Sequence, residues 1–110
     1  MTARHDARLT DQQIEEIAAR LLATYDQRAQ ISSLAAERAG FDLAAAYRVC
    51  AAVRRAREAR GERPIGRKLG FTNRNIWDEY KVYAPIWNYV YDTTVRTVSP
   101  DGADFDMGLV

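Results

Sequence analysis

Apolar positions in the first half of the chain recur at helical spacing in two separate stretches. The first stretch has apolar residues three, four and seven positions apart, namely Ile14, Ile17, Ala18, Leu21, Leu22 and Tyr25. Thr10 precedes this stripe, and its hydroxyl can accept a hydrogen bond from an amide of the first turn, so the pattern predicts a helix that begins there. Asp42 precedes the second stripe, which predicts a second helix that ends near Gly61.

Between the two predicted helices the apolar periodicity weakens. Ser32, Ser33 and Gly40 interrupt the pattern, and only Leu34 to Arg38 retains helical spacing. We therefore expect a loop with a single helical turn between the helices.

The second half of the chain carries strand signals. In residues 65–71 the character of the side chains alternates from one residue to the next, which is typical of a short strand. The glycines in this stretch indicate that another group approaches the backbone closely. Residues 89–98 are rich in tyrosine, valine and threonine and predict the clearest strand. Between these strands, residues 73–80 predict one or two helical turns capped by Asn73, and residues 82–87 predict an irregular connector.

This order predicts an α+β fold, with two N-terminal helices followed by a small, incomplete β-sheet. We interpret residues 1–110 as a single domain with a helical part, 1–63, and a strand-rich part, 64–110. Two short strands have exposed edges and are marginally stable alone, so the sheet is expected to be incomplete.

Composition narrows the classes of partner. The chain has 110 residues and a formal net charge of +1, which gives no overall attraction to nucleic acid in spite of an arginine-rich second helix. No stretch is long and apolar enough for a secretory signal or a membrane span, and a single cysteine, Cys50, cannot form an intrachain disulfide. We therefore expect a cytoplasmic protein with no nucleic-acid or membrane partner.

Several catalytic classes lack their residues. His5 is the only histidine and Cys50 the only cysteine, which excludes zinc sites and Ser-His-Asp or Cys-His arrangements. The glycines do not have the spacing of a phosphate-binding loop. Three late carboxylates, Asp101, Asp104 and Asp106, could loosely hold a divalent ion, but solvated carboxylates are the simpler interpretation, and no metal site is predicted.

Lys68 is the residue whose side chain is most suited to a chemical role. It lies inside the alternating strand pattern next to Leu69, where an ammonium group would lose hydration unless an anion or carbonyl groups met it. Two interpretations are open at this point: a ligand-binding lysine, or a structural one that is surface-exposed or paired with Asp92 or Asp78.

Three segments resemble a known family. They are Gly66–Asn73 (GRKLGFTN), Ala84–Trp87 (APIW) and Tyr91–Thr94 (YDTT), and together they resemble the 2-keto-4-pentenoate hydratases, which group with oxalocrotonate decarboxylases in the fumarylacetoacetate hydrolase-like fold. Asn88 departs from the family pattern, which has a glycine there. The resemblance implies the N-terminal portion of that fold.

The resemblance also implies roles for individual residues. Lys68 would meet a 2-keto acid and assist proton transfer, and Asp92 ranks second as a catalytic residue that orients Lys68, with the cap of a turn as its alternative. The residues implied to bind substrate are Arg67, Leu69, Gly70, Thr72 and Trp87. The residues themselves favour a structural turn role for Thr72 and core packing for Trp77, with an apolar cleft as the alternative for Trp77. Trp87 and Tyr91 are compatible with either a cleft or the core.

The activity implied is that of a hydro-lyase of aromatic-compound degradation, which adds water to a 2-hydroxy-2,4-dienoate. The family uses Mg²⁺ or Mn²⁺, held by a Glu-x-Glu pair and a third carboxylate that this sequence does not contain. Whether the chain is itself an enzyme is therefore left open. Its expected partners are a small 2-keto acid and a second polypeptide or a second copy. The alternative is a non-catalytic, truncated remnant or interaction module that pairs with a full-length relative.

Overall fold

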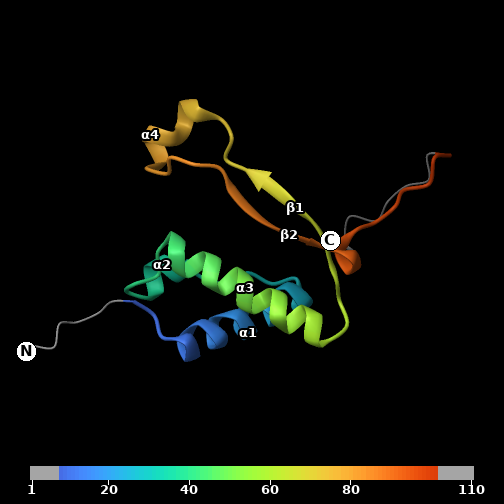
Figure 1. Cartoon of the computed structure of the whole chain (residues 1–110), viewed down its shortest axis with the longest axis horizontal. Coiled ribbons are helices and arrows are strands. Elements are labelled where there is room, and N and C mark those ends of the chain that lie inside the picture. Colours follow the sequence, from blue (N-terminus) through green and yellow to red (C-terminus); the bar gives the residue numbers. More distant parts are fainter. Residues whose placement is uncertain (1–7, 102–110) are drawn as a thin grey trace, which may run out of the picture. The chain divides into compact units, whose positions relative to one another are not determined.

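The computed structural model describes residues 8–101, which form helices and a small antiparallel sheet and confirm the α+β class. Contacts divide the chain between Arg60 and Gly61 into two compact units (Figure 1). We call residues 8–60 the helical unit and residues 61–101 the ribbon unit. The assignment of the whole chain to a single domain stays a prediction.

Helix α1, Asp11–Gln27, begins where the sequence predicts. The Thr10 hydroxyl accepts a hydrogen bond from the Gln13 amide at 3.1 Å, and the Gln13 side chain accepts one from the Thr10 amide at 2.8 Å. This reciprocal pair satisfies two amides that the helix itself leaves without acceptors.

Helix α3, Leu43–Ala59, begins at the second predicted cap, where the Asp42 carboxylate accepts a hydrogen bond from the Ala45 amide at 2.8 Å. The short helix α2, Leu34–Glu37, is the single turn expected between the two long helices. Ion pairs join Asp11 to Arg48 and Asp26 to Arg60, so the starts and the ends of α1 and α3 lie together. The two long helices therefore run parallel, and the segment containing α2 carries the chain back between them (Figure 1).

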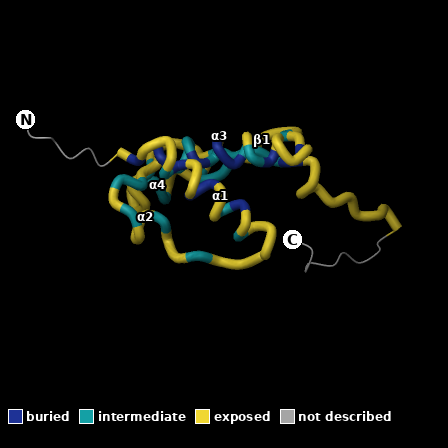
Figure 2. The backbone as a smooth tube through the Cα atoms, turned by 90° about the horizontal axis from the view of Figure 1, so that it is seen from below, coloured by how far each residue is buried: buried dark blue, intermediate teal, exposed yellow. Residues whose placement is uncertain are grey.

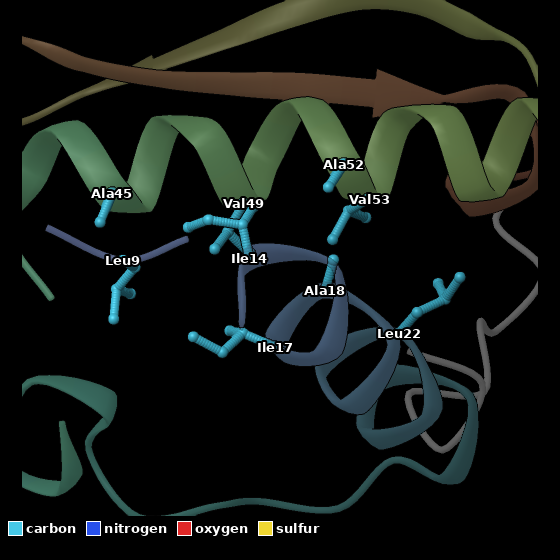
Figure 3. Packing of buried hydrophobic residues seen from close by; sticks show 9 residues of the cluster. All are labelled: Leu9, Ile14, Ile17, Ala18, Leu22, Ala45, Val49, Ala52 and Val53. Carbon is cyan, nitrogen blue, oxygen red and sulfur yellow. The ribbon is translucent and has the colours of Figure 1, made fainter. Parts of the chain in front are cut away.

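The core of the helical unit lies between α1 and α3 (Figure 3). Its buried members are Leu9, Ile14, Ile17, Ala18, Leu22, Ala45, Val49, Ala52 and Val53. Alanines at three of these positions let the helices approach closely, but they also leave few large side chains to supply hydrophobic stabilisation.

Ion pairs flank this small core. Arg55 pairs with Glu15 across the helices, and Arg20 binds Glu37 of α2 at 2.9 Å. Hydrogen bonds from Arg60 lower the pKa of the Asp26 carboxyl, and those from Arg20 lower the pKa of the Glu37 carboxyl. Both carboxylates therefore favour the folded state only while they are ionised.

The helical unit should lose stability in acid. Because the folded pKa values of Asp26 and Glu37 lie below their unfolded values of about 4, their contribution is complete above that pH and disappears as the pH falls through the folded pKa values. Thermal melts at about pH 7, 5 and 3, followed by the circular dichroism signal of the helices, should show this loss. Asp26→Asn combined with Glu37→Gln should flatten the dependence, whereas Asp78→Asn, in the ribbon unit, should not. An unchanged slope in the double variant would contradict the assignment.

The ribbon unit is built on strands β1, Pro64–Gly70, and β2, Ile86–Tyr91, paired antiparallel. Their connection contains the 3₁₀ turn η1, Arg74–Ile76, and helix α4, Trp77–Tyr80, as predicted. Asn73 caps η1, since its side chain accepts a hydrogen bond from the Asn75 amide at 3.0 Å. Figure 1 shows α4 at the tip of the ribbon. The turn η2, Asp92–Thr94, follows β2.

The predicted bounds of the second strand are wrong. The strand begins at Ile86, inside the predicted connector, and ends at Tyr91, well before Val98. Its partner β1 begins at Pro64, which faces Tyr91, so the residues that follow have no strand to pair with. Residues 92–101 are exposed instead (Figure 2). Strand propensity is expressed only where a partner strand lies alongside.

Candidate functional site

The register of the ribbon determines which predicted site residues can act together. Lys68 faces Asn88, Arg67 faces Tyr89, and Leu69 faces Trp87. Facing residues of an antiparallel pair share one side of the sheet, and successive residues alternate sides. One side of the ribbon, which we call the lysine face, thus contains Gly66, Lys68, Gly70, Ile86, Asn88 and Val90. The other side, the arginine face, contains Arg67, Leu69, Trp87 and Tyr89.

On the lysine face, Lys68 is exposed, and its ammonium group forms no hydrogen bond or ion pair within residues 8–101. Within these residues the ammonium is not enclosed, as in the surface-exposed alternative considered from the sequence. In a ribbon of two strands only a third layer could bury this face, and the described part of the ribbon unit has none. The pairing with Asp78 or Asp92 considered from the sequence is not formed either.

Two glycines flank Lys68 on this face. A Cβ atom built on Gly66 would have no atom within 4 Å, and one built on Gly70 would meet only Ile86 Cγ1, at 3.8 Å. Nothing in the described residues requires glycine at these positions, so the predicted close approach by another group is not made within them. Glycine weakens a strand by about 0.5–1 kcal/mol, and here it leaves a bare backbone on both sides of a cation.

Asn88 is the polar residue on this face that the sequence did not assign to the site. It lies within β2 directly opposite Lys68, and its side-chain oxygen accepts a hydrogen bond from the Tyr89 amide at 2.7 Å. The signal that could have found it is the strand register, which becomes available only when the start of β2 is correctly placed.

The arginine face holds three of the predicted substrate-binding residues. The Arg67 guanidinium carbon lies 4.8 Å from the centre of the Trp87 ring and 5.7 Å from that of Tyr89. The Trp87 and Tyr89 rings meet edge to face at 5.1 Å. Leu69 is on this face too and is 71% exposed. Because Arg67, Leu69 and Trp87 point away from the lysine face, the ribbon does not bring them together with Lys68.

Asp92 lies at the base of the ribbon, beyond the end of β2. Its carboxylate accepts a hydrogen bond from the Arg63 amide at 3.0 Å and lies 4.0 Å from the Arg63 side chain. It is four residues beyond Asn88, which faces Lys68, so about 13 Å of strand separates it from the lysine. Within the described residues Asp92 is therefore not placed to orient Lys68. It does not cap a turn either, because it is the first residue of η2, whose N-cap is Tyr91 and has no side-chain hydrogen bond.

A second polar contact closes the same end of the ribbon. The Thr93 hydroxyl donates a hydrogen bond to the Glu62 carboxylate, which is buried. Together with the contact between Asp92 and Arg63, it ties the residues before β1 to those after β2.

The connection at the tip contains the remaining predicted residues. Thr72 is exposed and follows β1. Trp77 is half-buried, and its indole nitrogen donates a hydrogen bond to the Phe71 carbonyl at 3.0 Å. The Phe71 and Tyr80 rings pack edge to face at 5.7 Å. Trp77 therefore has a structural role in the connection, which matches its interpretation as a packing residue.

The divalent-metal expectation has no counterpart in the part of the chain that the structure describes. No group of three histidine, cysteine, aspartate or glutamate side chains there could hold an ion. Asp104 and Asp106 of the late acidic cluster lie outside the described residues. Residues 8–101 by themselves therefore do not form a site for Mg²⁺ or Mn²⁺.

Among residues 8–101, no helix is long and apolar enough to cross a membrane.

The fold defined by these two units matches part of a fumarylacetoacetate hydrolase-like enzyme fold. Two matching structures are of 4-oxalocrotonate decarboxylase from Pseudomonas putida G7, one complexed with calcium and acetate and the other with magnesium and adipate. Each has a TM-score of 0.74 and 26% sequence identity, and the match covers 80% of this chain and 34% of the decarboxylase chain. No protein-family model and no curated protein sequence matches this chain.

The chain therefore spans about a third of the length of the enzyme it resembles. The likeness supports a general relationship to enzymes of this fold.

Proposed function

We propose that Lys68 binds the carboxylate of a small 2-oxo acid and that the chain contributes this residue to a metal-dependent lyase. The observation that carries the proposal is the exposed Lys68 on a strand face kept bare by Gly66 and Gly70. A cation without a partner among residues 8–101, flanked by glycine backbone, is suited to an anion that lies flat on the strand.

The complexes of the related decarboxylase support this chemistry. Each contains a divalent cation and a carboxylic acid, acetate in one and the dicarboxylate adipate in the other. The GRKLG motif around Lys68 favours hydration of a 2-hydroxy-2,4-dienoate in aromatic-compound degradation, whereas the related structures favour decarboxylation. Both reactions start from a carboxylate next to an oxygen-bearing carbon, so Lys68 would have the same binding role in either.

The described residues supply only part of such a site. Because they do not form a metal site, the ion would take its carboxylates from outside residues 8–101. When bound, the metal would act as a Lewis acid on the 2-oxo group. Lys68 would hold the carboxylate, and the bare glycine backbone would give the substrate room.

Binding of adipate tests this role directly. Titration of the full chain, followed by the NMR signals of the lysine side chains, should move Lys68 and leave Lys81, the other lysine, unchanged. Lys68→Ala should weaken binding by about tenfold or more, the loss expected for one charged hydrogen bond. Lys68→Arg should retain part of it. Lys81→Ala is the matched control, since it removes an equal charge at the tip of the same unit, and equal losses in the two alanine variants would refute a specific site.

Catalysis requires a separate measurement. The chain should be mixed with the C-terminal two thirds of a related enzyme and Mg²⁺, and the loss of a 2-hydroxydienoate and of an oxalocrotonate followed in parallel. Activity that depends on both polypeptides and on Lys68 would support the lyase, and its product would show which reaction applies. Adipate binding without activity in either assay would restrict the proposal to binding.

The exposed ribbon favours a second candidate function, that of a non-catalytic interaction module. Its strands and the basic stretch from Arg54 to Lys68 would pair with a longer relative or another polypeptide. The observation behind it is that the sheet of the described residues has only two strands, each of them an edge.

A further inference from the structure

The outer edge of β1 presents backbone groups that no other strand of residues 8–101 occupies. The Asp92 amide donates to the Arg63 carbonyl at 3.0 Å, and the Tyr89 amide turns to the Asn88 side chain. The register is irregular between Pro64 and Gly66, but beyond it the outward Tyr89 amide marks the pair of Tyr89 with Arg67 as non-hydrogen-bonded. Hydrogen-bonded and non-hydrogen-bonded pairs alternate along an antiparallel ladder, so we infer that the next pair, Lys68 with Asn88, is the hydrogen-bonded one. The amides and carbonyls of Arg67 and Leu69 must then point outward. Within residues 8–101 they form no backbone hydrogen bond outside the pairing of β1 with β2.

The side chains along this edge are also uncovered. Ile65 is 52% exposed, Leu69 is 71% exposed, and Arg67 and Lys68 lie between them. Apolar side chains beside outward backbone groups are typical of an edge that can accept another strand.

The charge of the edge limits what can pair with it. β1 contains Arg67 and Lys68 and no carboxylate, and neither cation forms an ion pair within the described residues. A second copy of β1, paired antiparallel about Arg67, would place that guanidinium opposite its own counterpart. Like charges placed directly opposite destabilise a strand pair, whereas opposite charges stabilise it. The edge thus disfavours a second copy and favours an acidic strand.

We propose that the outer edge of β1 binds an extended, acidic segment of another polypeptide as a third strand. The glycines define what it should contain: a large side chain beside Gly66, a carboxylate beside Lys68 and a large side chain beside Gly70, because large residues cover strand glycines well. This inference rests on the second candidate function, and it does not depend on binding of a 2-oxo acid.

Synthetic peptides test the proposal with the full chain. One short peptide contains phenylalanine, aspartate and phenylalanine at alternate positions, and its control has lysine in place of aspartate. Fluorescence anisotropy should show that the acidic peptide binds about tenfold more tightly. Amide hydrogen exchange should show protection of Arg67 and Leu69 on binding, with the amide of Lys68 unchanged.

Two variants locate the contact. Leu69→Pro removes an outward amide while leaving the ladder with β2 intact, and should abolish binding. Lys68→Glu keeps the backbone and should reverse the preference between the two peptides, which covers the case in which the proline variant fails to fold. Equal affinity for both peptides, no binding, or concentration-dependent dimerisation that protects the same amides would each overturn the proposal. Because adipate is absent, these outcomes are independent of the test of the 2-oxo acid site.

Discussion

Replacing Ile17 by alanine is expected to destabilise the helical unit by about 2–5 kcal/mol, the usual cost of deleting a large buried aliphatic side chain. Ile17 is 2% exposed, and among the described residues it is the largest side chain that is fully buried. Three of the nine core positions are alanines, which have little volume with which to fill the space left behind. The free energy of unfolding of a small domain is about 5–15 kcal/mol in total, so the variant should be close to unfolding.

The matched control for this variant is Leu43→Ala, which removes a similar side chain from the same unit at a position that is 51% exposed. It should cost less than about 1 kcal/mol. Urea denaturation followed by helical circular dichroism measures both. Similar midpoints for the two variants would show that α1 and α3 do not pack through Ile17.

Replacing Trp77 by alanine should release the connection at the tip of the ribbon. Phe71 has a φ of 58°, a left-handed conformation that costs a residue with a side chain about 1 kcal/mol or more. The contacts that hold it there are the hydrogen bond from Trp77 to the Phe71 carbonyl and the packing of Phe71 on Tyr80. Because Trp77 is only half-buried, we expect a loss of about 2 kcal/mol, which is below the range for a buried tryptophan.

Intermediate substitutions separate the two contributions of Trp77. Trp77→Phe keeps a ring and removes the hydrogen bond, so it should cost about 1 kcal/mol. Tyr83→Ala removes an exposed ring from the same connection and should be nearly neutral. Amide hydrogen exchange of residues 71–82 is the measurement, and unchanged protection in Trp77→Ala would mean that the connection is held by other contacts.

Local chemistry made the helices predictable. Thr10, Asp42 and Asn73 each cap the element that the sequence assigns to them, because a cap depends only on neighbouring residues. The end of β2 was not predictable in this way. The tyrosines, valines and threonines up to Val98 favour a strand, but pairing depends on where β1 begins, and β1 begins at Pro64.

The candidate site was predictable only in part for a similar reason. The motif identifies Lys68 and its glycines, but alternation along β1 puts Arg67 and Leu69 on the opposite face. The exposure of Lys68 depends on what else covers the ribbon, and a pattern of neighbouring residues contains no information about that. Asn88 entered the site only through a pairing between residues that are far apart in the chain.

The parallel arrangement of α1 and α3 has a consequence for how the chain folds. Two helices joined by a tight turn can assemble from the turn outward, but here the chain must return the full length of α1, about 26 Å, before α3 can dock. The pair that joins their starts, Asp11 and Arg48, is separated by 37 positions. Closing such a loop costs entropy before any contact compensates for it, so this helical unit should fold more slowly than an antiparallel helical hairpin of equal length.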